Sequence, residues 1–228
     1  MRKFFLFVLY SLLATPFLPA TSALASAIDG PANTPAPATR LTAWDFSLVL
    51  PGGKLQPLAA YRGKVLLIVN LASQSIYASQ LTALAQLQKT YADKGLVILG
   101  IPSAGFGHQE LTDPAAVAAW YSRQNLGFPV AAPAQLTGVH AIPLVDFLTH
   151  STGAPAGGDF HWNYTKFLLD RSGHPVRRFE ADEDPASPDF AVAIEGLLAQ
   201  PVPAASSKTD LAARHPSASR HASRHASR

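Results

Sequence analysis

The stretch VLLIVNL at residues 65–71 decides the fold expected for this chain. Its one polar side chain is Asn70, and it carries no charge. A nearly continuous apolar run of this length, rich in valine, leucine and isoleucine, is typical of a central strand that is buried on both faces. We therefore expect a layer of structure on each side of this strand.

The residues that follow predict a strand–helix–strand unit. Apolar side chains recur at spacings of three and four across residues 78–93, which predicts an amphipathic helix. These side chains are Leu81, Leu84, Leu87 and Tyr91. Lys94 and Gly95 suit the end of that helix. Because residues 96–101, LVILGI, repeat the buried-strand pattern, the three elements predict a right-handed βαβ unit with parallel strands.

Two hairpins and two further helices complete the expected domain. The hairpins are predicted over residues 46–58 and 165–180, and each is closed by a turn that contains glycine, at residues 51–53 and 171–174. The further helices are predicted over residues 114–124 and 188–199. An early βαβ unit with a later hairpin and a closing helix is the thioredoxin-like arrangement. The expected fold is therefore α/β, with a central mixed sheet flanked by helices.

The composition indicates one globular domain with extensions. The 228 residues are 48% hydrophobic and 14% charged, which is enough for one sizeable core. The formal net charge of +3 is unevenly placed, because residues 201–228 carry a net charge of +4 and leave −1 for residues 1–200. The basicity belongs to the end of the chain, which argues against a nucleic-acid-binding face.

The start of the chain predicts export. Arg2 and Lys3 precede an uncharged stretch that runs to Ala27 and ends in small residues with two A-x-A patterns. This pattern predicts a signal peptide over residues 1–27 that is cleaved rather than kept as an anchor. We therefore expect a periplasmic or secreted protein with no stable membrane span after cleavage.

The domain itself is expected over residues 41–200, between two segments of biased composition. Residues 28–40 are rich in proline, alanine and threonine, which predicts a flexible linker. Residues 201–228 are rich in alanine, serine, histidine and arginine, which predicts a disordered basic tail. The tail histidines could bind a metal or an anionic surface weakly, but a solvated tail is the simpler interpretation.

No cysteine occurs anywhere in the chain. This absence excludes disulfides, cysteine-ligated zinc, iron–sulfur clusters and every thiol nucleophile. The only methionine is Met1, which would leave with the signal peptide, so methionine cannot supply a redox sulfur either. The fold is therefore expected to be stable through its core alone.

Three segments resemble the glutathione peroxidase family. Residues 63–75, GKVLLIVNLASQS, are similar to the family pattern G-K-V-x-L-I-x-N-V-A-S-x-C, whose last position is cysteine or selenocysteine. Residues 94–110, KGLVILGIPSAGFGHQE, are similar to the stretch that leads into F-P-C-N-Q-F-G-x-Q-E, and residues 162–170, WNYTKFLLD, to W-N-F-x-K-F-L-V-D. The resemblance covers residues 42–200 in the right order. It implies a thioredoxin-like fold of the glutathione peroxidase type.

The same resemblance implies a catalytic cluster at four positions. Ser75 stands at the cysteine or selenocysteine position and Gly105 at the glutamine position, whereas Trp162 and Asn163 match the family. The family's chemistry needs a polarizable thiolate or selenolate that attacks a peroxide oxygen and becomes a sulfenic acid or its selenium counterpart. A serine hydroxyl is a weak nucleophile without an adjacent base, and it has no such oxidation state.

Each of these residues also has a structural interpretation. Trp162 could cover the end of a strand, and Asn163 could satisfy backbone groups in a turn. Ser75 lies where a helix should begin, so its hydroxyl and the nearby amides could cap the helix or bind an anion.

Three functions are compatible with the sequence. The first is an exported, non-catalytic binding or interaction module with an unknown protein or small-molecule partner. The second, which family membership implies, is a peroxidase acting against oxidative stress with glutathione or thioredoxin as reductant. The third is a serine hydrolase that pairs Ser75 with His108 or His161 and uses Asp159, although no nucleophile-elbow pattern is present. The same two histidines and Asp159 predict no metal site from their spacing, and no cofactor is expected.

Overall fold

The computed structural model describes residues 41–150 and 157–203. The expected signal peptide over residues 1–27 and the expected linker over residues 28–40 lie outside this part of the chain. So does the expected tail from residue 204 onward. The described residues contain most of the expected domain, the first three residues of the expected tail and all three segments that resemble the family.

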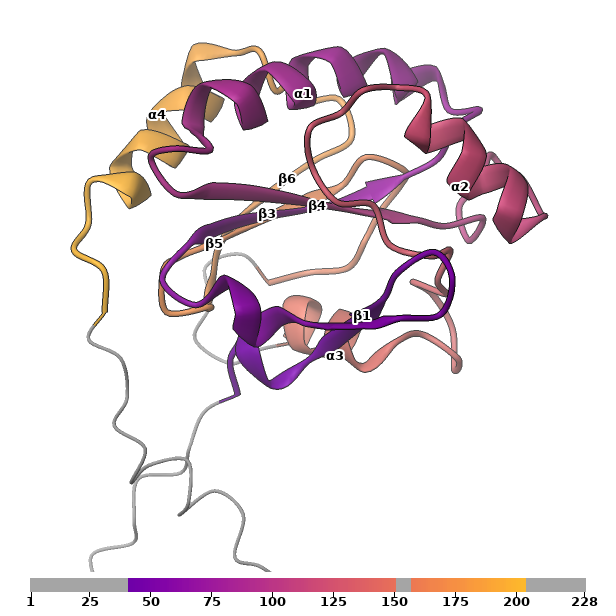
Figure 1. Ribbon diagram of the computed structural model, residues 1–228, viewed down its shortest axis with the longest axis horizontal. Helices are drawn as coiled ribbons and strands as arrows, with labels where there is room; N and C mark the ends of the chain where they lie inside the picture. Colours follow the sequence, from indigo (N-terminus) through magenta and orange to yellow (C-terminus); the bar gives the residue numbers. More distant parts are fainter. Residues whose placement is uncertain (1–40, 151–156, 204–228) are drawn as a thin grey trace, which may run out of the picture. The chain divides into compact units, whose positions relative to one another are not determined.

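Four strands form the central sheet, in the order β4-β3-β5-β6 (Figure 1). Strand β3 (Val65–Leu71) pairs in parallel with β4 (Leu96–Pro102) and antiparallel with β5 (Lys166–Leu169). Strand β5 pairs antiparallel with β6 (Pro175–Phe179). All seven residues of β3 are buried. The mixed sheet, the parallel βαβ unit and the double burial of β3 confirm the predictions made from its apolar run.

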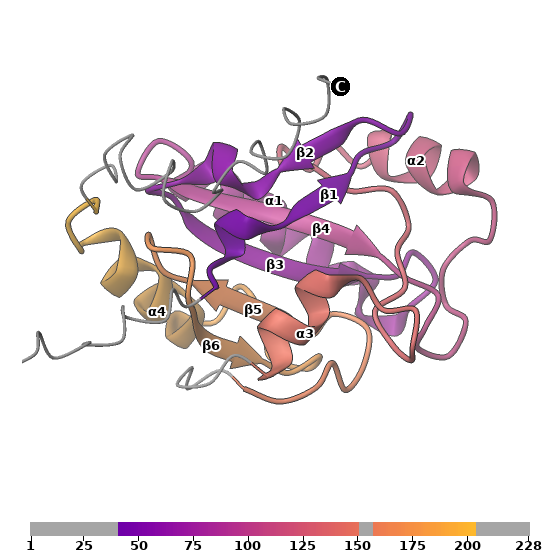
Figure 2. The same ribbon diagram turned by 90° about the horizontal axis from the view of Figure 1, so that it is seen from below.

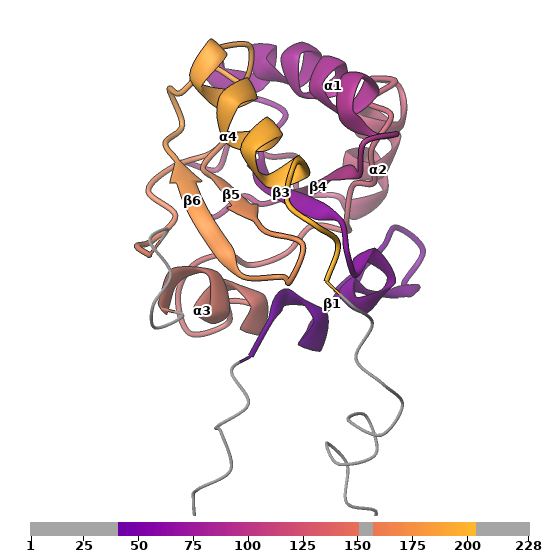
Figure 3. The same cartoon turned by 90° about the vertical axis from the view of Figure 1, so that its left-hand side faces the viewer.

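Helices cover both faces of this sheet (Figures 1 and 3). One face packs against α1 (Gln80–Tyr91), α2 (Pro114–Ser122) and α4 (Pro188–Leu198). The other face packs against α3 (Pro143–His150) and the hairpin of β1 (Ser47–Val49) and β2 (Leu55–Pro57). Alternate side chains of β3 point to opposite faces, with Leu67 and Val69 in the first layer and Leu66 and Ile68 in the second. The protein therefore has the expected α/β architecture.

The helix after β3 begins later than predicted. Residues 76–79 form a short 3-10 helix, η3 (Ile76–Ser79), and α1 begins only at Gln80. The hydroxyl of Ser75 accepts a hydrogen bond from the backbone N–H of Tyr77, which stabilises this tighter turn. At the other end, Gly95 adopts a φ of 107°, a conformation that favours glycine, and leads the chain into β4 as expected.

Three short helical elements were not predicted from the sequence. They are α3 and the 3-10 helices η1 (Ala43–Asp45) and η2 (Leu58–Tyr61). Helix α3 buries Leu144, Phe147 and Leu148 against the sheet, so it has an apolar face despite its length of 8 residues. The predicted helices over residues 114–124 and 188–199 both end one or two residues early. Across residues 41–150 and 157–203, no helix is both long and apolar enough to cross a bilayer.

Segments that carry the family motifs leave the sheet at one end. Because β3 and β4 are parallel, their C-terminal ends lie at the same edge of the sheet, and the antiparallel β5 begins there (Figure 2). Asn70, near the end of β3, pairs with the segment just before β5, since the backbone N–H of Tyr164 donates to its carbonyl. This arrangement brings residues 72–75, 103–110 and 162–164 to one edge.

Candidate functional site

Ser75 lies four residues after the end of β3, at the start of η3, and is buried, with 6% of its surface exposed. Its hydroxyl oxygen accepts from the backbone N–H of Tyr77 at 3.3 Å, and its own N–H donates to the carbonyl of Ala72 at 3.2 Å. The predicted capping role is confirmed, although the capped element is a 3-10 helix of 4 residues. A turn this short has little of the dipole that favours anion binding at longer helices.

Asn163 is fully buried and joins two parts of the site. Its side-chain amide donates to the carbonyl of Phe106 and to the side-chain oxygen of Gln109, both at 2.9 Å. The carbonyl of Gln109 in turn accepts from the N–H of Gln74, the residue before Ser75, at 2.9 Å. Asn163 therefore satisfies a backbone group, as one interpretation of the sequence expected, and the loop after β4 connects it to Ser75.

Trp162 lies at the rim of the site and is 38% exposed. Its ring packs against Gly107, where an added Cβ would lie 3.1 Å from the Trp162 ring. Gly107 has a φ of 68°, so both its conformation and this close approach favour glycine. The carbonyl of Trp162 accepts from the side-chain amide of Asn70 at 3.1 Å. The backbone of Trp162 therefore contacts the end of β3, whereas its ring packs on the loop after β4, so a role of the ring in covering the strand end stays a prediction.

Gly105 is packed closely by side chains of other residues. An added Cβ would lie 2.8 Å from the hydroxyl oxygen of Thr137 and 3.3 Å from that of Ser103. The N–H of Gly105 donates to the Ser103 hydroxyl at 3.2 Å. A glutamine at position 105 would therefore require Thr137 to move, a contact that the sequence did not predict.

A buried carboxylate, Glu110, connects the loop of Ser75 to its surroundings and was not predicted as a site residue. It accepts hydrogen bonds from the N–H and the hydroxyl of Ser73, from the N–H of Leu111 at 2.8 Å and from the hydroxyl of Tyr121 at 2.7 Å. Only 3% of Glu110 is exposed. In the sequence, Glu110 stands out only as the end of the second motif, which closes with Gln-Glu. Its hydrogen-bond partner Ser73 is distant in the chain, so the contact could not be predicted.

Burial and charge change the titration of groups around this carboxylate. Burial, with the negative charge of Glu110 as a further cause, raises the pKa of Tyr121 and of Tyr164 well above the usual tyrosine range. Both phenols therefore stay protonated at neutral pH. Burial lowers the pKa of Lys166, the first residue of β5, to about 8. Its amine donates to the carbonyls of Glu180, at 3.1 Å, and of Glu183, at 2.8 Å.

The histidines considered for a hydrolase do not pair with Ser75. His108 is exposed, and its φ of 53° reflects a tight loop. His161 has its Nδ1 3.3 Å from a carboxylate oxygen of Glu180. In the described part of the chain, neither histidine hydrogen-bonds to the Ser75 hydroxyl. The described residues also contain no group of three or more histidine, aspartate or glutamate side chains that could hold a metal ion.

Comparison with known proteins agrees with the motifs. The family model described as glutathione peroxidase matches residues 43–149. The chain is 38% identical over 142 residues to "Glutathione peroxidase homolog BsaA" of Halalkalibacterium halodurans, an alignment that covers 62% of this chain and 90% of the relative. It is 38% identical over 146 residues to "Probable phospholipid hydroperoxide glutathione peroxidase" of Solanum lycopersicum, covering 63% and 86%.

Solved structures agree with this assignment. The crystal structure of Trgpx in apo form superimposes with a TM-score of 0.57 at 26% sequence identity, covering 72% of this chain and 99% of that one. The match extends over nearly the whole of the solved chain. The chain belongs to the glutathione peroxidase family, within the thioredoxin-like superfamily.

Proposed function

We propose that this chain is an exported glutathione peroxidase relative that does not reduce peroxides and acts as a binding or interaction module. One observation carries the proposal. Ser75 occupies the position of the family's redox residue, and the chain has no cysteine elsewhere that could replace it.

The chemistry of peroxide reduction explains why this observation matters. When a thiolate attacks a hydroperoxide, the O–O bond breaks, one oxygen is transferred to sulfur and the other leaves as an alcohol or water. Two reducing thiols then return the sulfenic acid to the thiolate and release water. An alkoxide oxygen has no counterpart to the sulfenic acid, so Ser75 cannot accept the transferred oxygen and be recycled.

The neighbouring glutamine position supports the same conclusion. Gly105 provides no side-chain amide, and the space next to its Cα is taken by the Thr137 hydroxyl. A polar group that would stabilise a developing anion is therefore missing, and the surrounding residues have no room for one without a shift of Thr137. Two of the four cluster positions depart from the family in ways that agree with each other.

The retained residues do not require catalysis. Asn163 holds the loop after β4 through two hydrogen bonds, and the ring of Trp162 packs on Gly107. Both roles contribute to the fold whether or not a reaction takes place. Their retention does favour a second candidate function, the peroxidase activity in the names of the relatives, which would need a redox group other than cysteine.

A gain-of-function experiment tests the proposal. Purified Ser75→Cys protein is assayed with hydrogen peroxide and an organic hydroperoxide, using glutathione or thioredoxin as reductant. The matched control is Ser122→Cys, which places a thiol at an exposed position on α2. We expect turnover from Ser75→Cys and none from the control, since only position 75 lies in the retained framework. Equal activity of the two variants would contradict the assignment of Ser75 to the redox position.

Export is a separate part of the proposal. It is supported by the positively charged start, the uncharged stretch to Ala27 and the A-x-A patterns at residues 23–25 and 25–27. Mass spectrometry of the protein recovered outside the cytoplasm should give a chain that begins after residue 25 or 27. A protein that keeps its first residues and stays in the cytoplasm would contradict export.

A further inference from the structure

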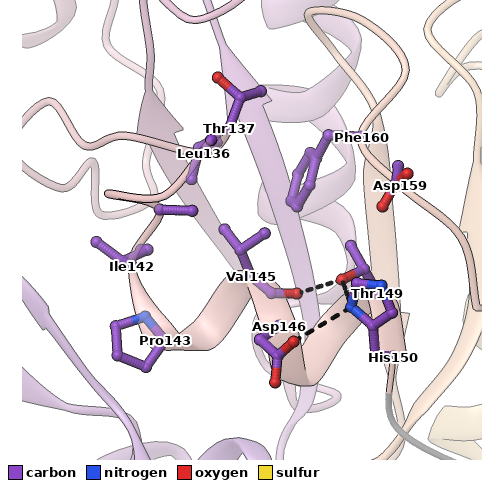
Figure 4. A pocket seen from close by; sticks show the side chains of 12 residues that line it. Leu136, Thr137, Ile142, Pro143, Val145, Asp146, Thr149, His150, Asp159 and Phe160 are labelled. Carbon is purple, nitrogen blue, oxygen red and sulfur yellow. Dashed lines mark hydrogen bonds and ion pairs between the residues drawn. The ribbon is translucent and has the colours of Figure 1, made fainter.

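A cavity with a volume of about 470 Å³ opens beside α3 (Figure 4). Its lining comes from the loop before α3, from one face of α3 and from Asp159 and Phe160, and it contains none of the four cluster residues. Thr137, which packs on Gly105, belongs to its wall. The volume lies within the range of pockets that bind small organic molecules.

One side of this cavity is apolar. Figure 4 shows Leu136, Ile142 and Pro143 on one side, together with Thr137, whereas Asp146, His150 and Asp159 lie on the other side. Leu136 and Phe160 are buried and belong to the core that covers the sheet. A hydrocarbon group placed here would be removed from water on a preformed surface.

The other side offers hydrogen-bond acceptors. Asp146 and Asp159 each present a carboxylate, and the described residues that line the cavity include no lysine or arginine. The hydroxyl of Thr149 donates to the carbonyl of Val145 at 2.9 Å and lies 2.7 Å from Nδ1 of His150, an arrangement that matches the tautomer with its hydrogen on Nδ1. In the neutral imidazole, a hydrogen on Nδ1 leaves Nε2 as an acceptor.

The two carboxylates differ in their present partners. Asp146 has one oxygen 3.3 Å from Nδ1 of His150. Asp159 accepts no side-chain hydrogen bond from the described residues, because Arg178 donates to its backbone carbonyl and pairs instead with Glu180. The polar side therefore keeps negative charge and acceptor capacity for a ligand.

We propose that this cavity binds a small primary amine with an apolar body. The ammonium group supplies three N–H donors to the carboxylates and the imidazole, and the body packs against Leu136, Ile142 and Phe160. A quaternary ammonium carries the charge without these donors, and a neutral alcohol carries one donor without the charge. The inference does not depend on whether the protein reduces peroxides.

The test uses protein-observed NMR of the full chain with 2-phenylethylamine as the probe. We expect saturable shifts at the residues of the cavity, with a dissociation constant on the order of 1 mM for a ligand of this size. The comparison ligands are 2-phenylethanol and the trimethylammonium analogue of the probe. Both should bind at least about fivefold more weakly than the amine.

Protein variants test the contribution of the carboxylates. The double variant Asp146→Asn/Asp159→Asn keeps the shape of both side chains and should weaken amine binding about fivefold, since exposed charge pairs contribute modestly. The matched control, Asp93→Asn, removes an exposed carboxylate at the end of α1 and should leave binding unchanged.

Three results would overturn the proposal. They are equal affinity for the amine and the alcohol, unchanged amine binding in the double variant, and shifts confined to residues outside the cavity. None of these results depends on peroxidase activity, so failure here and failure of the proposed function can be told apart.

Discussion

The two halves of the candidate site differ in how firmly the fold holds them. In the framework half, Asn163 and Glu110 are buried and together form hydrogen bonds to segments after β3, after β4 and on α2. In the reaction half, Ser75 makes one capping bond and Gly105 has no side chain. Framework residues can be retained for stability alone, whereas the reaction half can change without loss of the fold.

Among the substitutions that test this difference, Glu110→Ala is expected to cause the largest loss of stability. Glu110→Ala removes the acceptor for Ser73, Leu111 and Tyr121, so buried donors lose their partner. The free energy of unfolding should fall by about 3 kcal/mol, measured by urea denaturation. The matched control is Glu195→Ala, which also loses a tyrosine hydrogen bond but at an exposed carboxylate, and should cost less than about 1 kcal/mol. Similar losses of stability in the two variants would mean that the buried hydrogen bonds of Glu110 stabilise the fold no more than one exposed hydrogen bond does.

A second prediction concerns Lys166, which begins β5 three residues after Asn163. Its pKa of about 8 lies below the ordinary value of 10.5, so between these pH values the unfolded chain binds more protons than the folded one. The contribution of this group to stability therefore rises as the pH rises from 8. Between pH 8 and 9.5, the unfolding free energy of the wild type should therefore rise by about 1.5 kcal/mol relative to that of Lys166→Met.

The measurement stops at pH 9.5 because of the buried tyrosines. Their pKa values are raised in the folded protein, so at higher pH they would lower the stability as the pH rises. Lys54→Met, at an exposed lysine, is the control and should show no such trend. If the unfolding free energy of the wild type stayed constant or fell relative to that of Lys166→Met over this pH range, the lowered pKa would be contradicted.

A substitution of Gly105 should lower the stability less, because the neighbouring side chain, Thr137, is exposed and can move. Gly105→Ala places a Cβ against the Thr137 hydroxyl and should lower the free energy of unfolding by about 1 kcal/mol. Adding Thr137→Ala should recover most of this loss, which a double-mutant cycle measures. If the two substitutions were additive, the contact with Thr137 would not be what restricts position 105.

The smallest effect is expected at Ser75. Ser75→Ala loses one capping bond of 3.3 Å to a 3-10 turn and should cost about 0.5 kcal/mol in thermal or urea unfolding. A loss comparable to that of Glu110→Ala would place Ser75 in the framework half and remove the distinction between the two halves.

The sheet and most helices were predictable because their signals are local. The apolar run of β3 and the spacing of Leu81, Leu84 and Leu87 indicate burial without knowledge of the rest of the chain. Helix α3 was missed because its pattern spans only 8 residues, although a helix that begins at Pro143 and buries Leu144 and Phe147 had a recognisable signal.

Contacts between distant segments could not be predicted in this way. Glu110 meets Ser73 across 37 residues, and the place of Thr137 beside Gly105 depends on how the loop before α3 packs. The resemblance to the family placed Ser75, Gly105, Trp162 and Asn163 in one cluster, and the structure brings the three segments that carry them to one edge of the sheet. Whether the four positions act together in chemistry stays a prediction.

Hydroperoxide turnover by the wild-type mature protein tests the central claim most directly. The rate of reductant oxidation is measured against protein concentration, with glutathione and with thioredoxin, and compared with reductant and peroxide alone. Because no thiol is available to be oxidised, the predicted rate equals the background at every protein concentration. A rate that rises in proportion to the wild-type protein and falls in Ser75→Ala would contradict the claim that the chemistry was lost with the cysteine.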